Sequence, residues 1–526
     1  MKVNILGGGP AGLYFAILLA KRGGHHRITV VERDGPDDTF GWGIVFSDRT
    51  LAFLKDTDEE THGAITSACQ TWDNVDVVHR GRKLSVHGNG FSGIARLAFL
   101  NILQRRCLDL GVDIRFRTAV ADPSDWLDAD LLLGADGANS AVRRTWADSF
   151  QPSVDIRVNR YVWLGTSQLF HGLVMIFRMS QAGLFIAHAY KFSPAMSTFI
   201  VECGPDTWTR AGFEHMSQTE TCAYLERVFA PDLEGAPLLA NNFVRWLNFP
   251  LVKTRHWTHR HATPGAAGAS VPVVLAGDAA HTAHFSIGSG TKLALEDAIA
   301  LAAALRDCGD VPAALAAYEG SRKPRVDAFQ AAALRSLLWL ENVEAHLDLD
   351  PVPFTYKHMM RSQRVGYARL RLMDPAFAAL YDDWRRSERE AGPVPREFLD
   401  LFEKATFAHL ATSMPDGSPQ VTPVWVDYDG RHILINSAAG RQKDRNMEQR
   451  RRVAIEIPDP DNPNRYLAVR GTVVDITEDG ADEHLDRLAR RYLGRDRYPD
   501  SYRFPGERRR IYRIAPERVT AWDPFG

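Results

Sequence analysis

The chain has 526 residues, of which 45% are hydrophobic and 24% are charged; this is the composition of a globular protein and excludes a disordered or fibrous one. Its 63 basic and 65 acidic side chains leave a net charge of -2, so no overall field favours nucleic acid or an anionic membrane. Five scattered cysteines without a C-x-x-C pair exclude a disulfide framework, and no apolar run reaches the length of about 18 residues that spans a membrane. We therefore expect a cytoplasmic protein, and we assign it no metal site.

The first part of the chain predicts a βαβ unit followed by further strands of the same kind. Helices are expected at 12–21 and 290–306, where apolar and small residues recur at helical spacing. Short apolar runs that predict strands occupy 3–6, 28–32, 130–135 and 271–276. Between them, residues 160–202 alternate apolar and polar positions, which is typical of an antiparallel sheet. Residues 313–384 are rich in Ala and Leu and predict helices.

The pattern changes at 386–396, where Gly392-Pro393 indicates a linker. Beyond it, short strands are expected at 407–412, 420–426, 432–436, 453–457 and 467–476. The dipeptides Asp416-Gly417 and Asp429-Gly430 separate consecutive strands and predict tight hairpins. Strands at this spacing predict a small barrel.

The turn between the first strand and the first helix has the sequence Gly7-Gly8-Gly9-Pro10-Ala11-Gly12, a G-x-G-x-x-G motif. Gly7 permits the tight turn, Gly9 admits a pyrophosphate to the backbone, and Gly12 lets helix and strand pack closely. The free N–H groups at the helix start attract phosphate oxygens. Glu32, followed by Arg33, ends the next strand, where a carboxylate accepts hydrogen bonds from ribose hydroxyls. The motif predicts a dinucleotide and does not separate FAD from NAD.

Two Asp-Gly segments decide between those cofactors. Residues 133–140 contain Asp136-Gly137 after a strand, and residues 274–281 contain Gly277-Asp278 after another. Together with the glycine motif they resemble the single-component FAD-dependent aromatic monooxygenases, the p-hydroxybenzoate hydroxylase-like class, over residues 1–385. The class implies NAD(P)H as co-substrate without a separate nicotinamide domain. The implied parts are an α/β Rossmann-type FAD domain (about 1–150 and 265–330), an inserted antiparallel substrate sheet (about 155–260) and C-terminal helices (313–385).

The resemblance also implies roles for individual residues. Asp278 is expected to hold a ribityl hydroxyl, and Arg96 to reach the ribityl chain or a phosphate, with an ordinary ion pair as its alternative. Val120 is expected to present its backbone to adenine, and Asp136 to serve both FAD and nicotinamide. The loops expected to lie against the cofactor contribute Gly7, Gly9, Pro10, Ala11, Gly12, Gly288, Ser289, Gly290 and Thr291.

Three segments resemble a narrower subgroup, the anthraniloyl-CoA and salicylyl-CoA hydroxylases. They are residues 41–48 (GWGIVFSD), 284–290 (HFSIGSG) and 361–364 (RSQR), and the second lacks the proline usual in the class. The tryptophan-derived hydroxylases of violacein assembly are more distantly similar. The subgroup implies hydroxylation, with dioxygen, of an aromatic or tropone-like ring that carries an acid or a CoA thioester. If oxygen enters at the carbon that bears a carboxylate, decarboxylation follows.

Four side chains are candidates for work at the ring. The resemblance places His284 and Ser286 beside the flavin, where a histidine could deprotonate a phenol or orient an amine. His188 and Tyr190 share one face of a strand, because side chains two positions apart point the same way; a hydrogen-bonded core pair is the alternative for them. The basic run 255–261 (RHWTHRH) could meet a CoA phosphate or form a solvated edge.

Residues 397–526 resemble the split-barrel flavin-binding family related to pyridoxamine phosphate oxidase, especially its deazaflavin-using branch. The segment 436–443 matches the phosphate-contacting segment of that family, which makes Arg441 and Lys443 the expected cations. The implied cofactor is FMN or a deazaflavin, and the implied assembly is a homodimer. The alternative is a barrel that only dimerises the protein.

Two other functions are compatible with part of this pattern. FAD halogenases share the glycine motif but carry a Trp-x-Trp-x-Ile-Pro segment that this chain lacks. A flavin-holding interaction protein would bind FAD without consuming nicotinamide. The sequence predicts neither the substrate nor the choice between NADH and NADPH.

Overall fold

The computed structural model describes the 526-residue chain apart from residues 24, 40, 242–243, 263–269 and 524–526. It forms two compact units, Met1–Ala378 and Ala379–Gly526, which we describe in turn. Within the described residues, no helix combines the length and the apolarity that crossing a membrane requires. The expected start of the second FAD-binding part, at about residue 265, lies outside the described residues.

A six-stranded sheet forms the nucleotide-binding half of the first unit. Its strand order is β16-β17-β9-β1-β2-β8, with β16 antiparallel to β17 and the other pairs parallel. The strands are β1 (Lys2–Leu6), β2 (Arg27–Val31), β8 (Asp113–Arg115), β9 (Leu131–Gly134), β16 (Thr258–Ala262) and β17 (Ser270–Leu275). Helix α1 (Pro10–Lys21) packs against α4 (Arg96–Asp109) and α10 (Gly290–Asp307). The four apolar runs are confirmed as strands of this sheet, because parallel strands buried on both faces are apolar throughout.

A second, mainly antiparallel sheet of eight strands follows the order β14-β10-β13-β12-β11-β5-β6, with β15 paired to β10. Its strands are β5 (Val75–His79), β6 (Arg82–Val86), β10 (Pro152–Thr166), β11 (Leu173–Ser180), β12 (Gly183–Lys191), β13 (Ser197–Cys203), β14 (Leu238–Leu239) and β15 (Leu247–Thr254). One face buries an apolar core that includes Phe185, Phe199 and Phe229. The helices that follow β13 are α7 (Pro205–Ala211), α8 (Gln218–Val228) and α9 (Ala230–Leu233).

The limits expected for this sheet, 155–260, omit two of its strands. Strands β5 and β6 come from residues 75–86, and β5 joins the sheet by pairing in parallel with β11, with Val75 opposite Leu173. A short apolar run such as that at 75–78 does not indicate which sheet it joins, because that choice is made by tertiary packing.

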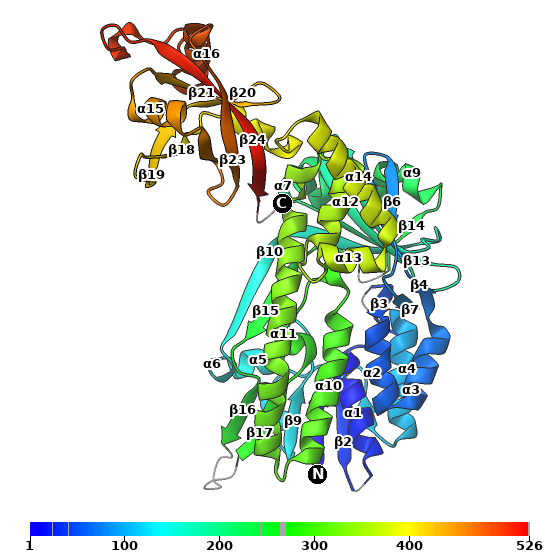
Figure 1. Cartoon of the computed structure of the whole chain (residues 1–526). Coiled ribbons are helices and arrows are strands. Elements are labelled where there is room, and N and C mark those ends of the chain that lie inside the picture. Colours follow the sequence, from blue (N-terminus) through cyan, green and yellow to red (C-terminus); the bar gives the residue numbers. More distant parts are fainter. Residues whose placement is uncertain (24, 40, 242–243, 263–269, 524–526) are drawn as a thin grey trace. The chain divides into compact units, whose positions relative to one another are not determined.

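The remaining elements of the first unit complete its helical layer. A small sheet contains β3 (Gly43–Ser47), β4 (Gln70–Trp72) and β7 (Phe91–Ala95). The helices are α2 (Asp48–Thr57), α3 (Glu59–Ala68), α5 (Ala141–Thr145), α6 (Ala147–Phe150), α11 (Val311–Glu341), α12 (Pro351–Met360) and α13 (Tyr367–Met373). Figure 1 shows α10 and α11 side by side.

The second unit is a seven-stranded barrel-like sheet in the order β19-β18-β22-β23-β24-β21-β20. Its elements are β18 (Ala408–Ser413), β19 (Pro419–Val424), β20 (Val426–Tyr428), β21 (Ile433–Ala438), α15 (Gln442–Gln449), β22 (Arg452–Pro458), β23 (Tyr466–Thr477), α16 (Ala481–Leu493) and β24 (Arg509–Trp522). Gly417 (φ +84°) and Gly430 (φ +93°) lie in the two hairpin turns that their Asp-Gly dipeptides predict. The run expected at 420–426 is broken at Trp425 into β19 and β20.

The segment 386–396 is not a linker throughout, contrary to expectation. Helix α14 (Pro375–Ala391) contains its first residues, because good helix formers continue up to the Gly392-Pro393 break. Val394 is buried in the apolar core of the second unit together with Phe398 and Leu401. The second unit, which begins at Ala379, therefore contains the whole segment that was expected to connect the two domains.

Candidate active site

In the glycine motif, Gly7 and Gly12 are packed tightly against other parts of the backbone, whereas Gly9 borders open space. A Cβ atom on Gly7 (φ +113°) would lie 2.2 Å from the Ala135 oxygen, and one on Gly12 would lie 2.2 Å from the Gly7 oxygen. A Cβ on Gly9 would meet nothing within 4 Å. Pro10 and Ala11 begin α1, which has no side-chain cap at its N-terminus. The open position and the free N–H groups are those that a pyrophosphate requires.

The carboxylate of Glu32 is fixed beside the glycine loop. Its oxygens accept hydrogen bonds from the Gly8 nitrogen at 2.7 Å and the Asp34 nitrogen at 3.0 Å. The backbone oxygen of Glu32 accepts a hydrogen bond from the Thr118 nitrogen at 2.9 Å. This bond brings the segment before Val120 close to the end of β2. Arg33 lines the main cavity of the unit. Val120 is not among the described residues that line the cavity; it packs partly against the core.

The two Asp-Gly segments are tied together by Arg143. One carboxylate oxygen of Asp136 accepts from the Ala141 nitrogen at 2.6 Å, while its other oxygen is buried without a partner among the described residues. Asp278 is exposed to the cavity, and its carboxylate accepts no hydrogen bond from the described residues. The guanidinium of Arg143 donates to the oxygens of Ala138 and Ala279. Asp278 is thus held by its backbone with its acid group available to a hydroxyl.

Arg96 and the loop before α10 complete this end of the cavity. Nε of Arg96 donates a hydrogen bond to the Thr39 hydroxyl at 3.1 Å. Burial lowers the pKa of Arg96, whereas the nearby Asp278 and Tyr190 favour its charged form. Gly288 adopts φ +59°, and a Cβ there would lie 2.9 Å from Val45. The four residues predicted to contact the cofactor here, Gly288, Ser289, Gly290 and Thr291, all line the cavity.

The cavity has a volume of about 1320 Å³ and extends from Asp278 and the 288–291 loop to the second sheet. The glycine motif, Glu32 and Asp136 are not among the described residues that line it. Met175, His188, Tyr190 and Ile200 line it from the sheet, and Arg361 lines it from the end of α12. Asp278 and the loop before α10 thus open on the same space as a face of alternating apolar and polar side chains.

Three of the four predicted ring-contacting residues line this cavity. The Tyr190 hydroxyl donates to the Gly43 oxygen at 2.8 Å, and burial raises its pKa well above the usual value. The Ser286 hydroxyl lies 2.9 Å from that of Ser336. His188 has Nε2 at 3.2 Å from Glu202 and packs edge-on against Phe285.

His284, the fourth, is placed differently. It is absent from the described residues that line the cavity, and its Nδ1 accepts from the Ser286 nitrogen at 3.4 Å, at the start of the short 3-10 turn 285–287. Its ring packs edge-on against Phe249. Burial lowers the pKa of His284 to about 4, although Glu202 opposes the change. His284 therefore shapes the loop that carries Ser286, and it is a weak proton acceptor.

Two further side chains belong to this site: Glu202, which no pattern in the sequence singled out, and Arg361, which was noted only as part of the segment 361–364 and without a role. Arg361 donates from Nε to the Ser336 hydroxyl at 2.9 Å and from Nη2 to the Ser286 oxygen at 2.8 Å. Burial lowers the pKa of Arg361 to about 10, and the negative charge of Glu202 partly offsets this change. Glu202 itself is 1% exposed. An acid inside the apolar run of β13 was the available signal for it.

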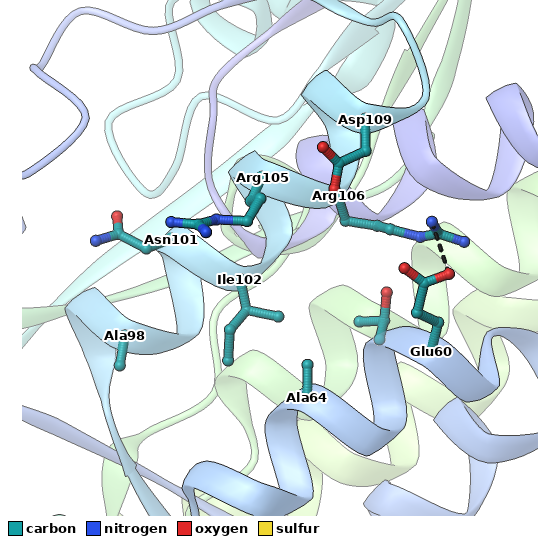
Figure 2. Close-up of a pocket in the computed structure, with 9 residues that line it drawn as sticks. Glu60, Ala64, Ala98, Asn101, Ile102, Arg105, Arg106 and Asp109 are labelled. Atoms are coloured by element: carbon teal, nitrogen blue, oxygen red, sulfur yellow. Dashed lines mark ion pairs between the residues drawn. The ribbon is translucent and has the colours of Figure 1, made fainter.

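The basic run 255–261 lies elsewhere. None of its described residues lines the cavity, and Trp257 is 1% exposed within the core of the nucleotide-binding half. A smaller hollow of about 330 Å³ lies between α3 and α4, where Arg106 pairs with Glu60 at 2.8 Å (Figure 2). No predicted site residue lines that hollow.

The second unit gathers cations at the start of α15. Arg441 precedes the helix, and Lys443 is 9% exposed without an ion pair to any described residue. Burial lowers the pKa of Lys443 to about 8, and the positive charges of Arg441 and Arg509 act in the same direction. Glu507 pairs with Arg509 at 3.0 Å and lies 3.8 Å from Arg441. Arg509 joins the group because β24 pairs with β21, a relation that the sequence does not reveal.

Comparison with known proteins places both units. Residues 5–43 match the NAD(P)-binding Rossmann-like domain family, and residues 394–523 match the pyridoxamine 5'-phosphate oxidase family. Over 407 residues, 76% of either chain, the sequence is 38% identical to a salicyloyl-CoA 5-hydroxylase of a Streptomyces species.

Two further relatives and a solved structure agree. A 3-hydroxy-4-methyl-anthranilyl-[aryl-carrier protein] 5-monooxygenase of Streptosporangium sibiricum is 36% identical over 64% of this chain and 89% of its own. A protodeoxyviolaceinate monooxygenase of Chromobacterium violaceum is 34% identical over 67% of this chain and 92% of its own. The tetrameric form of 2-methyl-3-hydroxypyridine-5-carboxylic acid oxygenase has a similar fold, with a TM-score of 0.52 at 20% identity over 73% of this chain and 97% of that one.

Proposed function

The chain belongs to the family of FAD-dependent aromatic hydroxylases that includes salicyloyl-CoA 5-hydroxylase, and we propose that it hydroxylates an aromatic ring carried as a thioester. One observation carries the proposal: a single cavity connects Asp278 and the 288–291 loop, which are expected to contact the flavin, to the side chains of the second sheet. NAD(P)H and dioxygen are the co-substrates. A free aromatic acid is the second candidate substrate, since no described part of the cavity distinguishes it from a thioester.

The cofactor site is assigned to the loops of the first unit. Bound FAD accepts electrons from NAD(P)H and supplies to the ring one oxygen atom of dioxygen. Asp278 would accept a hydrogen bond from a ribityl hydroxyl of FAD, because its carboxylate faces the cavity without a partner in the described chain. Gly9 and the start of α1 would hold the pyrophosphate, Glu32 would hold a ribose, and Arg96 would reach the ribityl chain or a phosphate.

The remaining cavity residues hold the ring and exclude water. Met175 and Ile200 give it apolar walls. Tyr190 is committed to the Gly43 oxygen, so it fixes the position of β3 more than it acts on a proton. Arg361 anchors the Ser286 backbone, which holds the Ser286 hydroxyl at the cavity wall. Water exclusion favours transfer of oxygen to the ring over wasteful decay.

The test is product analysis with the purified full chain. Salicyloyl-CoA, anthraniloyl-CoA and the corresponding free acids are each incubated with NADH or NADPH under labelled dioxygen. We expect one thioester to accelerate nicotinamide oxidation and to gain one labelled oxygen atom on its ring. FAD binding without substrate-dependent nicotinamide oxidation would instead indicate a flavin-holding protein. Unlabelled product would refute oxygen insertion from dioxygen.

For the second unit we infer an anion site at Arg441, Lys443 and Arg509 that receives the phosphate of FMN or of a deazaflavin. Three cations face one carboxylate there, so the group keeps an excess of positive charge. A barrel that only joins two copies of the chain is the alternative. Titration of the full chain with FMN, followed by fluorescence quenching, separates the two, because a purely dimerising barrel leaves the FMN emission unchanged. We further propose a homodimer and a cytoplasmic location.

A further inference from the structure

The carboxylate of Glu202 is buried beneath the cavity without a permanent positive partner. It is 1% exposed, and no Lys or Arg of the described chain forms an ion pair with it. Its oxygens are bound by the Asn159 amide at 2.8 Å and by His188 Nε2 at 3.2 Å. Burying a carboxylate is costly unless it is paired. A buried acid whose one ionic partner is a histidine facing a cavity is a candidate for function more than for stability.

The register of the sheet sets the order of these groups. Ile186 is opposite Glu202 across the β12–β13 pair, which makes His188 its diagonal neighbour on the same face. The intervening residues Ala187 and Val201 belong to the apolar core on the other face. His188 lines the cavity and Glu202 does not. The chain of contacts therefore runs from the cavity to His188, then to Glu202.

A bulge in β10 supplies the last contact of this chain. The pairing of β10 with β15 shifts between Ile156 and Arg160, and Asn159 lies within the shift. Bulges re-aim side chains that a regular strand would point elsewhere. Asn159 is 7% exposed and donates its amide to Glu202, so one carboxylate oxygen is fixed while the other meets the histidine.

The carboxylate also fixes which ring nitrogen of His188 is protonated. Burial alone would raise the pKa of Glu202, but the hydrogen bond from His188 and the field of His284 hold it below its usual value. An ionised carboxylate only accepts hydrogen bonds, so Nε2 of His188 carries the proton. Nδ1 then has a free lone pair, and it has no hydrogen-bond partner among the described residues.

We propose that His188 accepts the proton of a ring hydroxyl of the substrate and that Glu202 is the positioning residue that holds His188 in this role. The substrate O–H bond breaks, its proton passes to Nδ1, and the phenolate forms beside an imidazolium that faces Glu202. No electron transfer accompanies the step. The phenolate is more electron-rich than the phenol, which favours attack by an electrophilic oxygen. The inference rests on the proposed function and deepens it: the substrate ring carries an ionisable hydroxyl.

The first measurement needs no turnover. The FAD-loaded full chain is mixed with 4-nitrophenol in a buffer that keeps the free probe mostly protonated, and the difference spectrum reports the ionised probe. We expect an ionised band with the wild type and at least a tenfold smaller one with Glu202→Gln or His188→Gln. Glu341→Gln is the matched control, because Glu341 is also a buried glutamate (side chain 4% exposed) but pairs with Arg157. It should leave the band unchanged.

The second measurement follows turnover of salicyloyl-CoA. Glu202→Gln should lower kcat at least tenfold and change KM less than threefold. The loss should shrink with 3-fluorosalicyloyl-CoA, whose hydroxyl ionises more readily. A variant that is merely misfolded would lose both substrates equally and would bind less FAD.

The two hypotheses fail separately. Wild-type protein that does not ionise 4-nitrophenol, or a Glu202→Gln variant that matches the wild type in band and kcat, overturns the role of the pair while hydroxylation stands. If none of the thioesters or acids gains oxygen, the proposed function fails, and the nitrophenol band still decides the role of Glu202.

Discussion

The guanidinium of Arg143 donates from Nη1 to the oxygen of Ala279 at 2.8 Å, across 136 positions of the chain. It also donates to the Ala138 oxygen, so one buried side chain, 4% exposed, fixes the two Asp-Gly segments relative to each other. These bonds fix the relative positions of the segments that carry Asp136 and Asp278, the two acids proposed for the cofactor site. The segments were predicted from the sequence, but the bond that joins them was not.

Arg143→Ala should reduce FAD affinity at least tenfold and lower the melting temperature of the full chain. The change leaves buried carbonyl oxygens without donors, at a cost of about 1–3 kcal/mol. The measurement is FAD content after gel filtration together with thermal unfolding at several FAD concentrations. Arg144→Ala is the control, because Arg144 is exposed and donates to the Asn139 oxygen nearby. Equal FAD content in the two variants would contradict the role given to Arg143.

Asp278→Ala should leave the first unit folded and largely without FAD. It removes a charged hydrogen-bond acceptor worth about 1.5–3 kcal/mol, or roughly one to two orders of magnitude in affinity. Asp278→Asn, which keeps an acceptor oxygen, should bind FAD with intermediate affinity. Flavin released by heat and identified by chromatography is the measurement. An Asp278→Ala protein with full FAD occupancy would remove this carboxylate from the cofactor site.

His284→Asn and His188→Asn should separate the two histidines. The side chain of Asn can still accept a hydrogen bond from the Ser286 nitrogen, so the 285–287 turn should persist and kcat should fall less than about threefold. His188→Asn removes the cavity-facing ring and should lower kcat at least tenfold. Steady-state kinetics with the identified substrate decides. A larger loss for His284→Asn than for His188→Asn would return the proton-accepting role to His284.

Affinity of the second unit for FMN should fall as pH rises from 7 to 9. Lys443 has a pKa of about 8, so it is charged below that pH and neutral above it. At pH 9, one unit above this pKa, only about one tenth of Lys443 stays protonated. Because the FMN phosphate is already dianionic at pH 7, this predicts roughly a tenfold loss of FMN affinity. Lys443→Gln should bind weakly at both pH values. Wild-type affinity that does not change with pH would exclude Lys443 from the phosphate contact.

A chain that ends at Ala391 should keep FAD and nicotinamide-dependent hydroxylation and should lose dimerisation. The first unit contains its own cores and every residue proposed for FAD. Arg441→Ala in the full chain should leave hydroxylation nearly unchanged. Light scattering and product analysis test both statements. Loss of hydroxylation in Arg441→Ala, with FAD and dimer intact, would show that the second unit takes part in the reaction.

The nucleotide-binding half could be predicted because its signals are local. The glycine motif, the apolar strands and the Asp-Gly turns each depend on residues adjacent in the chain, and Gly7 and Gly12 leave no room for a side chain in the fold. The hairpins of the second unit follow from their Asp-Gly dipeptides for the same reason. Local propensity and tertiary packing agree in these segments.

The ring-binding part could be predicted only incompletely. Ser286, His188 and Tyr190 were predicted for the ring and do line the cavity. Glu202 depends on the register between β12 and β13, and Arg361 depends on where the end of α12 meets the 285–287 turn. His284 was also predicted for the ring, but it is absent from the described residues that line the cavity, and its ring packs against Phe249. Its role at the ring stays a prediction. Register and loop direction are set by contacts between distant segments.

The parallel pairing of β5 with β11 limits how this fold can be recombined. A segment from β10 to β15 looks like a transferable module for exchanging substrate preference among relatives. Cut out alone, it would leave the backbone of Leu173 and its neighbours on β11 without the partners that β5 provides, and an unpaired apolar edge favours aggregation. A functional chimaera therefore has to inherit residues 75–86 from the same parent as β11, although an alignment would assign them to the cofactor domain.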